Sequence, residues 1–262
     1  MVHNGNAAVI TAVNKKKGER LLMKIKKRFL GILLSLALML GMMPGMSLTA
    51  YADEEYLLYV GGIQVTKSNA SNIVGDDTIT ASYVADTKTL TLNGFNHNDY
   101  NIMSNIDVLT VIINGDTNTI GGMVMSLGSL NIEGSGTLNI EGTGGSAIHS
   151  YGDLTISGRV NITADKSDTG IMCGSKLTLE STGTIYVKGS SYGLLSNGEI
   201  DITDGNVTAE GGITGIGLNG GGAPLVIGTD AKLTAIGGDK GAIYYDSASN
   251  HRTVQNKIAG VA

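Results

Sequence analysis

The sequence predicts an all-β fold: a right-handed parallel β-helix, a solenoid with three short strands in each coil, with an N-terminal β-hairpin cap. Three observations lead to this prediction. A three-part unit recurs from about residue 109 onward, apolar and polar residues alternate within each part, and small residues separate the parts. Self-similarity at a period of this size is typical of solenoids, because each unit buries its apolar face only against its neighbours.

The first 52 residues are predicted to be a leader that contains a secretory signal peptide. Basic residues at 24–28 precede an apolar run over 29–43, and Ala-Tyr-Ala follows at 50–52. A charged region, an apolar region and a small-residue cleavage site in this order are typical of such a peptide, and residues 1–22 are a candidate over-extended start. We therefore expect a secreted or cell-surface, extracellular protein without stable membrane insertion after signal cleavage; an uncleaved membrane anchor is the alternative.

Residues 53–88 do not follow the repeat and are predicted to form the N-terminal β cap. Two alternating segments, 56–60 and 63–66, flank Gly61-Gly62 as the strands of a hairpin flank its turn. Residues 79–84 and 87–92 are expected to form a second pair of strands. The open end of a solenoid exposes apolar core and unpaired backbone, so a cap is required there.

The parallel β-helix is expected over residues 89–250. The first strands of five successive units begin at Leu130, Leu154, Leu177, Ile200 and Leu225, at spacings of 24, 23, 23 and 25 residues. Alternation with period two places the Leu, Ile and Val side chains of each strand inward, where they would stack into aliphatic ladders. A β-sandwich, the rival fold, does not predict three parts that recur in phase.

Three details of the coils follow from the same pattern. An earlier, less regular unit is expected to pass through Ile120 and Met123, and Gly158, Gly183 and Gly205 are expected to provide positive φ angles at the corners. The lone cysteine, Cys173, is expected to be a small buried hydrophobe, because it lies two residues past an inward position. Residues 251–262 are expected to be a C-terminal tail, and a truncated repeat array stays an alternative.

Charge limits the classes of partner. Residues 53–262 contain 10 basic and 22 acidic side chains, a formal net charge of −12, because the basic residues gather in the leader. An acidic surface repels the phosphate backbone, so no nucleic-acid binding is expected. Cations and neutral or cationic polymers are the better candidates, and a polysaccharide is the partner that we predict.

A row of apolar and aromatic side chains is the candidate ligand-binding site. If the third strand of each coil points its anchors inward, the residue after each anchor points outward. Tyrosine faces stack on sugar rings, and exposed apolar patches mark binding surfaces. The alternative is that the third part is a turn and that the row is ordinary packing. The candidate ligand-binding residues are His149, Met172, Leu195 and Tyr244 in the row, which also passes through Gly217, with Tyr151, Tyr192 and Tyr245 close by.

Clustered carboxylates suggest calcium as the only candidate ion. The candidate metal ligands are Asp165, Asp168, Asp201 and Asp204. Weak oxygen-rich sites suffice at the millimolar calcium levels outside cells. No cluster follows the EF-hand loop or the glycine-rich nonapeptide repeat, and solvated turn residues are the alternative for these side chains.

Three segments resemble a known family: Leu58-Tyr-Val-Gly-Gly-Ile-Gln-Val65, Thr89-Leu-Thr-Leu-Asn93 and Leu109-Thr-Val-Ile-Ile-Asn-Gly-Asp-Thr-Asn-Thr-Ile120. They are similar to exported parallel β-helix proteins of Gram-positive anaerobes that are labelled carbohydrate-binding domain-containing. The resemblance implies non-catalytic binding of a plant or host polysaccharide, with calcium held by carboxylates.

The predicted function is therefore that of a non-catalytic, polysaccharide-binding exported protein. The first alternative is a surface adhesin or structural rod that contacts host or cell-wall glycans. The second is a polysaccharide lyase or hydrolase, because such enzymes share the architecture, although we predict no catalytic residues and regard an enzyme as the weaker interpretation.

Overall fold

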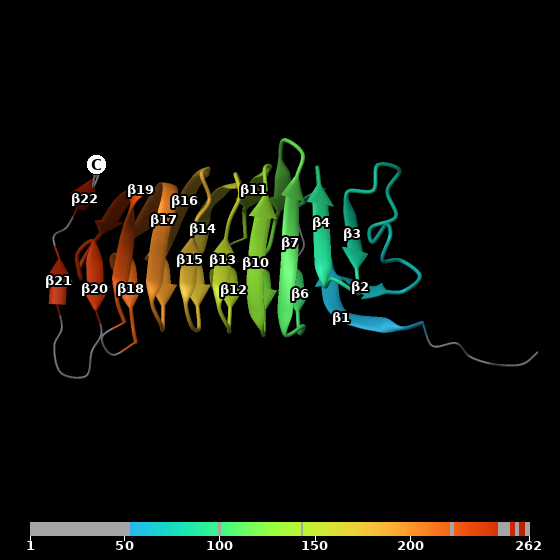
Figure 1. Ribbon diagram of the computed structural model, residues 1–262, viewed down its shortest axis with the longest axis horizontal. Helices are drawn as coiled ribbons and strands as arrows, with labels where there is room; N and C mark the ends of the chain where they lie inside the picture. Colours follow the sequence, from blue (N-terminus) through green and yellow to red (C-terminus); the bar gives the residue numbers. More distant parts are fainter. Residues whose placement is uncertain are drawn as a thin grey trace, which may run out of the picture. The chain divides into compact units, whose positions relative to one another are not determined.

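The computed structural model describes residues 53–98, 101–142, 144–220, 223–245, 252–254 and 257–259. The predicted leader lies outside these residues. The described chain is all-β and has no helix, and its strands build a parallel solenoid of about seven coils (Figure 1). The predicted fold class is confirmed. A helix long and apolar enough to cross a membrane is accordingly not found in this part of the chain.

Each coil contributes one strand to each of three parallel sheets. The first sheet contains β4 (Thr89–Asn93), β7 (Val108–Asn114), β10 (Ser129–Gly134), β13 (Leu154–Ile156), β15 (Leu177–Leu179), and the beginnings of β17 (Ile200–Gly211) and β19 (Leu225–Gly237). The second contains β5 (Asn96–His97), β8 (Asn118–Ile120), β11 (Thr137–Ile140), the beginnings of β14 (Asn161–Cys173) and β16 (Thr184–Ser196), and the later parts of β17 and β19.

The third sheet is the one that matters most for the candidate site. It contains β6 (Ile102–Ser104), β9 (Val124–Ser126), β12 (Ser146–Ser150), the ends of β14 and β16, β18 (Thr214–Leu218) and β20 (Ile243–Tyr245). Long strands such as β14 and β16 serve two sheets because they continue around a corner.

Aliphatic ladders fill the interior, as the alternating pattern predicts. In the first sheet Leu130, Leu154, Leu177 and Ile200 lie in register on successive coils and are fully buried. In the third sheet the corresponding ladder is Ile102, Val124, Ile148, Ile171, Leu194, Ile216 and Ile243. The core is mainly aliphatic, because Leu, Ile and Val side chains of similar shape stack from coil to coil, and the fully buried Phe95 is an aromatic member of it.

A second, polar ladder lies at the corner where the third sheet leads into the next coil. Ser126, Ser150, Cys173 and Ser196 are in register and have no exposed surface. The Cys173 thiol lies 3.2 Å from the carbonyl oxygen of Lys176 and 3.3 Å from that of Gly152. The expectation of a buried Cys173 is confirmed, although it replaces a serine in the ladder and contacts carbonyl groups.

Two details of the predicted coils need correction. Gly158 and Gly205 have positive φ angles of 75° and 77°, but Gly183 does not. Glycine is required at Gly183 because a Cβ there would lie 2.3 Å from the carbonyl oxygen of Val160 on the previous coil. The inward residue of the early coil is the buried Val124, and not the half-buried Met123.

The two predicted hairpins form at the N-terminal end. β1 (Glu55–Val60) pairs antiparallel with β2 (Ile63–Thr66), and β3 (Ala81–Val84) pairs antiparallel with β4. β1 also pairs antiparallel with β6, so it extends the third sheet by one strand beyond the coils (Figure 1). At the other end β21 (Arg252–Val254) and β22 (Lys257–Ala259), within the predicted tail, pair antiparallel with β20 and β19.

Candidate functional site

The outward face of the third sheet holds one continuous row of mainly apolar side chains, which we call the outer row. Each member is next to a buried residue of the aliphatic ladder, so the alternation of the strand directs it away from the core. The register places the members side by side on successive strands. The outer row comprises Tyr59, Met103, Met125, His149, Met172, Leu195, Gly217 and Tyr244.

The structure therefore brings His149, Met172, Leu195 and Tyr244 into the single row that the sequence predicts. Tyr151 also faces outward and is 56% exposed. Its ring stacks on that of His149, with centroids 4.4 Å apart and an interplanar angle of 21°. Half burial of the imidazole lowers the pKa of His149 below its ordinary value, because a charged ring loses hydration there. The pair presents a flat, uncharged surface at neutral pH.

The C-terminal half of the outer row is closed. Leu195 and Tyr244 are each only 8% exposed, and the ammonium of Lys240 lies 4.2 Å from the ring centroid of Tyr244. A Cβ on Gly217 would lie 2.8 Å from the Leu195 Cδ1 atom and 3.1 Å from the Tyr192 ring. Tyr192 and Leu195 therefore lean over the position that glycine leaves open, and little apolar surface is available to a ligand.

Tyr245 does not join the row. It lies in register with the buried Leu218, which belongs to the inward set, and it is half-buried and packs against the core. Of the seven predicted ligand-binding residues, Tyr151 is the only one classed as exposed, while His149, Met172 and Tyr192 are half-buried.

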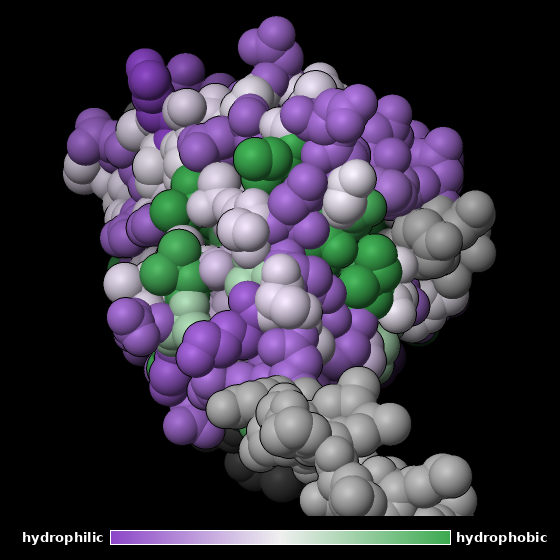
Figure 2. Space-filling model, turned by 90° about the vertical axis from the view of Figure 1, so that its right-hand side faces the viewer, coloured by the Kyte–Doolittle hydropathy of each residue, from purple (hydrophilic) through white to green (hydrophobic). Residues whose placement is uncertain are grey.

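The N-terminal half of the outer row is open and continues into a groove. Tyr59 and Met103 are 45% and 40% exposed, and Leu57 and Leu127 beside them are 58% and 48% exposed. Together with Met125 they line a concavity of about 290 Å³, which we call the apolar groove. Figure 2 looks at the cap end and shows apolar surface in patches among hydrophilic residues. The sequence-based prediction of the site missed these five residues.

The sequence contains the information that locates the apolar groove, but strand alternation and strand pairing must be combined to extract it. Once Val124 is taken as the inward residue, Met125 follows it outward. Met103 then lies one coil earlier, and Tyr59 joins through the antiparallel pairing of β1 with β6. The last step depends on a contact between segments more than forty residues apart (59 and 103).

The four predicted calcium ligands do not form a common site. The Asp168 Oδ1 atom accepts hydrogen bonds from the Ser190 and Ser191 hydroxyls, at 2.6 and 2.7 Å. The Asp204 Oδ1 atom accepts one from the backbone N–H of Gly205 at 2.6 Å. Asp165 is exposed in β14, whereas Asp201 and Asp204 belong to β17.

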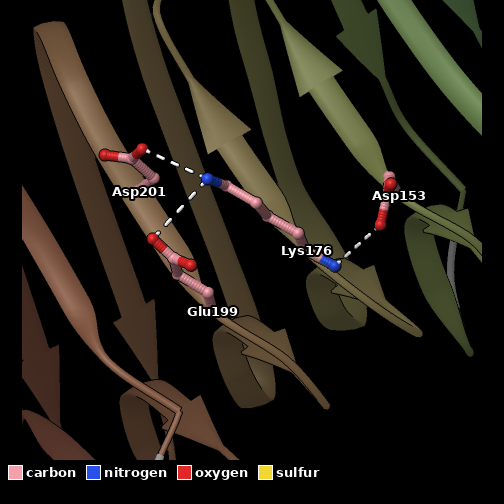
Figure 3. A network of polar contacts seen from close by, with 4 residues as sticks. All are labelled: Asp153, Lys176, Glu199 and Asp201. Carbon is pink, nitrogen blue, oxygen red and sulfur yellow. Dashed lines mark hydrogen bonds and ion pairs between the residues drawn. The ribbon is translucent and has the colours of Figure 1, made fainter.

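Asp201 belongs to a charged network on the first sheet (Figure 3). Lys176 Nζ lies 3.5 Å from both Asp201 Oδ2 and Glu199 Oε1, and the Lys176 backbone N–H donates to Asp153 Oδ1 at 3.1 Å. The buried Asp201 Oδ1 atom has no hydrogen-bond partner, but the ammonium already occupies the place of a cation between the two carboxylates. In the described ranges no group of three or more His, Cys, Asp and Glu residues is arranged to hold a metal. Calcium binding stays a prediction from sequence.

Comparisons with known proteins support a carbohydrate-related role. The family model of the carbohydrate-binding domain-containing proteins matches residues 39–255, which is most of the chain. No curated protein and no solved structure is significantly similar to it. With an all-β solenoid and an outward apolar row in place, the match over residues 39–255 shows that the chain belongs to the carbohydrate-binding domain-containing protein family.

Proposed function

We propose that this protein is an exported, non-catalytic polysaccharide-binding protein and that the open half of the outer row, with the apolar groove, is its contact surface. Membership of the carbohydrate-binding domain-containing family supports the ligand class. The observation on which the proposal rests is the in-register outward row from Tyr59 to Met172, with Tyr59 and Met103 exposed at its open end. Exposed apolar surface on an otherwise acidic protein has a hydration cost that a sugar ring would relieve.

The geometry suits a chain of sugars. The strands of one sheet are about 4.8 Å apart, so the row offers contacts at regular intervals along the solenoid axis. The Tyr59 ring and the stacked pair of His149 and Tyr151 provide flat faces for sugar rings, and the methionines between them adapt to irregular shapes. Thr and Asn hydroxyl and amide groups are absent from this row, so apolar stacking is the main attraction that we infer for it.

The composition of the outer row supports the proposal of binding without turnover. Glycosidases use two carboxyl groups that flank the bond to be cleaved, about 5–5.5 Å or 6.5–9.5 Å apart. The outer row contains no carboxylate, and burial lowers the pKa of His149, which favours its neutral form. The row is thus equipped to hold a chain and is not equipped with an acid–base pair.

A glycan array, combined with assays for reducing ends and unsaturated products on plant, host and cell-wall polysaccharides, tests this proposal. We expect binding without product, and a loss of binding in Tyr59→Ala. Tyr245→Ala, which removes a half-buried tyrosine outside the row, is the matched control and should bind normally. Product formation would refute the non-catalytic proposal. A lack of binding to every glycan would favour a structural rod.

Export is tested separately from binding. The signal-peptide pattern of residues 1–52 supports it. We expect the protein to accumulate outside the cell with Asp53 as its first residue, which N-terminal sequencing of the secreted protein measures. Retention of residues 29–43 in membranes would instead indicate an uncleaved anchor.

A further inference from the structure

A second concavity adjoins the apolar groove at the N-terminal cap. We call it the cap pocket; it has a volume of about 400 Å³ and is formed by β1, the turn after β3 and the segment between β6 and β7. Leu57 and Asn105 line both concavities. The backbone N–H of Asn105 donates to the carbonyl oxygen of Leu57 at 2.8 Å, so these two residues form a common wall. The groove and the cap pocket are therefore adjacent and share this residue pair.

The cap pocket combines aromatic rings with negative charge. Tyr56 and Tyr83 are among its lining residues, with ring centroids 5.2 Å apart and planes tilted by 54°. Four carboxylates line it, and Lys88 is its one basic residue. One of the carboxylates, that of Glu54, pairs with Lys67 at 3.6 Å.

The other three carboxylates outnumber Lys88, the one basic residue of the pocket lining. Glu55, Asp86 and Asp107 are exposed, and within the described part of the chain none of them has an ion-pair partner within 4 Å. Carboxylates attract a cation, and the faces of tyrosine rings attract cations as well. The pocket is thus complementary in charge to an ammonium group and repels uronates and sulfated sugars.

We propose that the apolar groove and the cap pocket together bind a glycan of amino sugars with free amino groups. This inference rests on the proposed glycan-binding function and names its ligand class. The apolar face of a sugar ring lies on Tyr59 and Met103 in the groove, and the ammonium of the same or the next sugar enters the field of Glu55, Asp86 and Asp107. Neutral sugars make the apolar contacts of the groove but gain no charge interaction in the pocket, and the carboxylates of the pocket repel acidic sugars. A cationic peptide satisfies the pocket but offers no rigid ring face to Tyr59, so the glycan is the better match.

Titration calorimetry of the purified protein with a glucosamine oligosaccharide, and with the same oligosaccharide fully N-acetylated, tests the inference. The two probes share a sugar backbone, and acetylation replaces each ammonium with a neutral amide that also carries a methyl group, so the charge variants are needed to assign the difference to charge. Exposed charge contacts contribute roughly 0.2–1 kcal/mol each, or about 1.4- to 5-fold in affinity, so three of them predict a preference of roughly 3- to 150-fold for the free amine. Added salt should reduce that preference, because it screens exposed charges.

Variants assign the preference to the pocket. Glu55→Gln and Asp107→Asn should each reduce the preference by about 1.4- to 5-fold and leave binding of the N-acetylated probe unchanged. Asp230→Asn, which removes an exposed carboxylate of β19 near the opposite end, is the matched control and should change neither affinity. Tyr59→Ala should weaken both probes. Circular dichroism of each variant verifies that the fold is retained.

The results that would overturn the inference can be distinguished from those that would overturn the proposed glycan-binding function. Equal affinity for the two probes, with both weakened by Tyr59→Ala, would overturn the amine preference and leave the glycan-binding function in place. No binding of any glycan would overturn both. A lysine oligomer that binds more tightly than the glucosamine oligosaccharide, and that loses affinity in Glu55→Gln and Asp107→Asn, would overturn the inference in favour of a cationic peptide.

Discussion

The polar ladder at the corner of the coils provides a direct test of whether equivalent positions on successive coils have equivalent roles. Ser150 is fully buried, and its hydroxyl lies 2.9 Å from the Asp153 carbonyl oxygen and 3.0 Å from that of Gly128 on the previous coil. Ser150→Ala removes the hydroxyl donor and creates almost no cavity, while the Gly128 and Asp153 carbonyl oxygens keep the hydrogen bonds that they accept from the Gly152 and Leu130 backbone N–H groups. The net contribution of one such hydrogen bond is about 0.5–1.5 kcal/mol, so this is the loss of unfolding free energy that we expect.

Cys173→Ser is the matching change one coil later. The thiol is a weak donor in the same ladder position, and the Gly152 and Lys176 carbonyl oxygens lie 3.3 and 3.2 Å away. A hydroxyl there restores the residue type of the neighbouring coils, so we expect unfolding free energy to change by no more than about 1 kcal/mol. Ser150→Ala loses a donor of the ladder whereas Cys173→Ser keeps one, so we expect the larger loss from Ser150→Ala although both alter one buried side chain of the same ladder.

Urea unfolding followed by circular dichroism measures both effects. Solenoid stability is a sum of coil and interface terms, so only variants that keep the wild-type slope should be compared by midpoint. Ser157→Ala, which removes a half-buried hydroxyl on the following turn, is the control and should be nearly neutral. A larger loss for Cys173→Ser than for Ser150→Ala would refute the idea that equivalent positions on successive coils have equivalent hydrogen-bonding roles.

Three further predictions concern the thiol, a corner glycine and calcium. Burial raises the pKa of Cys173, so the native thiol should resist a thiol reagent. The free energy of unfolding should also fall as alkaline pH ionises the thiol of the unfolded chain. Labelling rates with and without urea measure the protection of the thiol, and rapid labelling of the native protein would contradict the prediction. Gly183→Ala should cost about 1–3 kcal/mol in urea unfolding, because its Cβ would lie 2.3 Å from the Val160 carbonyl oxygen, and a neutral result would mean that the corner is not tightly packed. A chelator should leave the melting midpoint unchanged, since Asp168 and Asp201 are already engaged by serines and Lys176; a lower midpoint would support the calcium prediction.

The regular coils could be predicted from sequence because two independent periods agree. Alternation within each strand assigns the inward residues, and the spacing of about 23 residues between coils aligns Leu130, Leu154 and Leu177. An error of one residue would expose every aliphatic side chain of a strand, so the register is strongly determined. The outward direction of His149 and Met172 follows from the same reasoning.

The remaining features depend on contacts that periodicity does not encode. Met123, Val124 and Met125 are consecutive apolar residues, so alternation alone cannot choose which one points inward. The second strand of the first coil, β5, has only two residues and lies in an asparagine-rich segment. The closure of the row at Leu195 depends on the Tyr192 ring, which leans over Gly217 of the next coil.

The N-terminal cap provides a binding site that the regular coils do not repeat. Regular coils repeat the same outward geometry, so they offer a ligand many similar contacts and little discrimination between sugars. β1 breaks the repeat: its antiparallel pairing with β6 aligns Tyr59 with the outer row and at the same time places Glu55 beside the turn that carries Asp86. The strand that covers the exposed core thereby joins an apolar surface to a charged pocket. Specificity should accordingly respond to substitutions in residues 54–60 and 86–107 and be insensitive to the number of coils that follow.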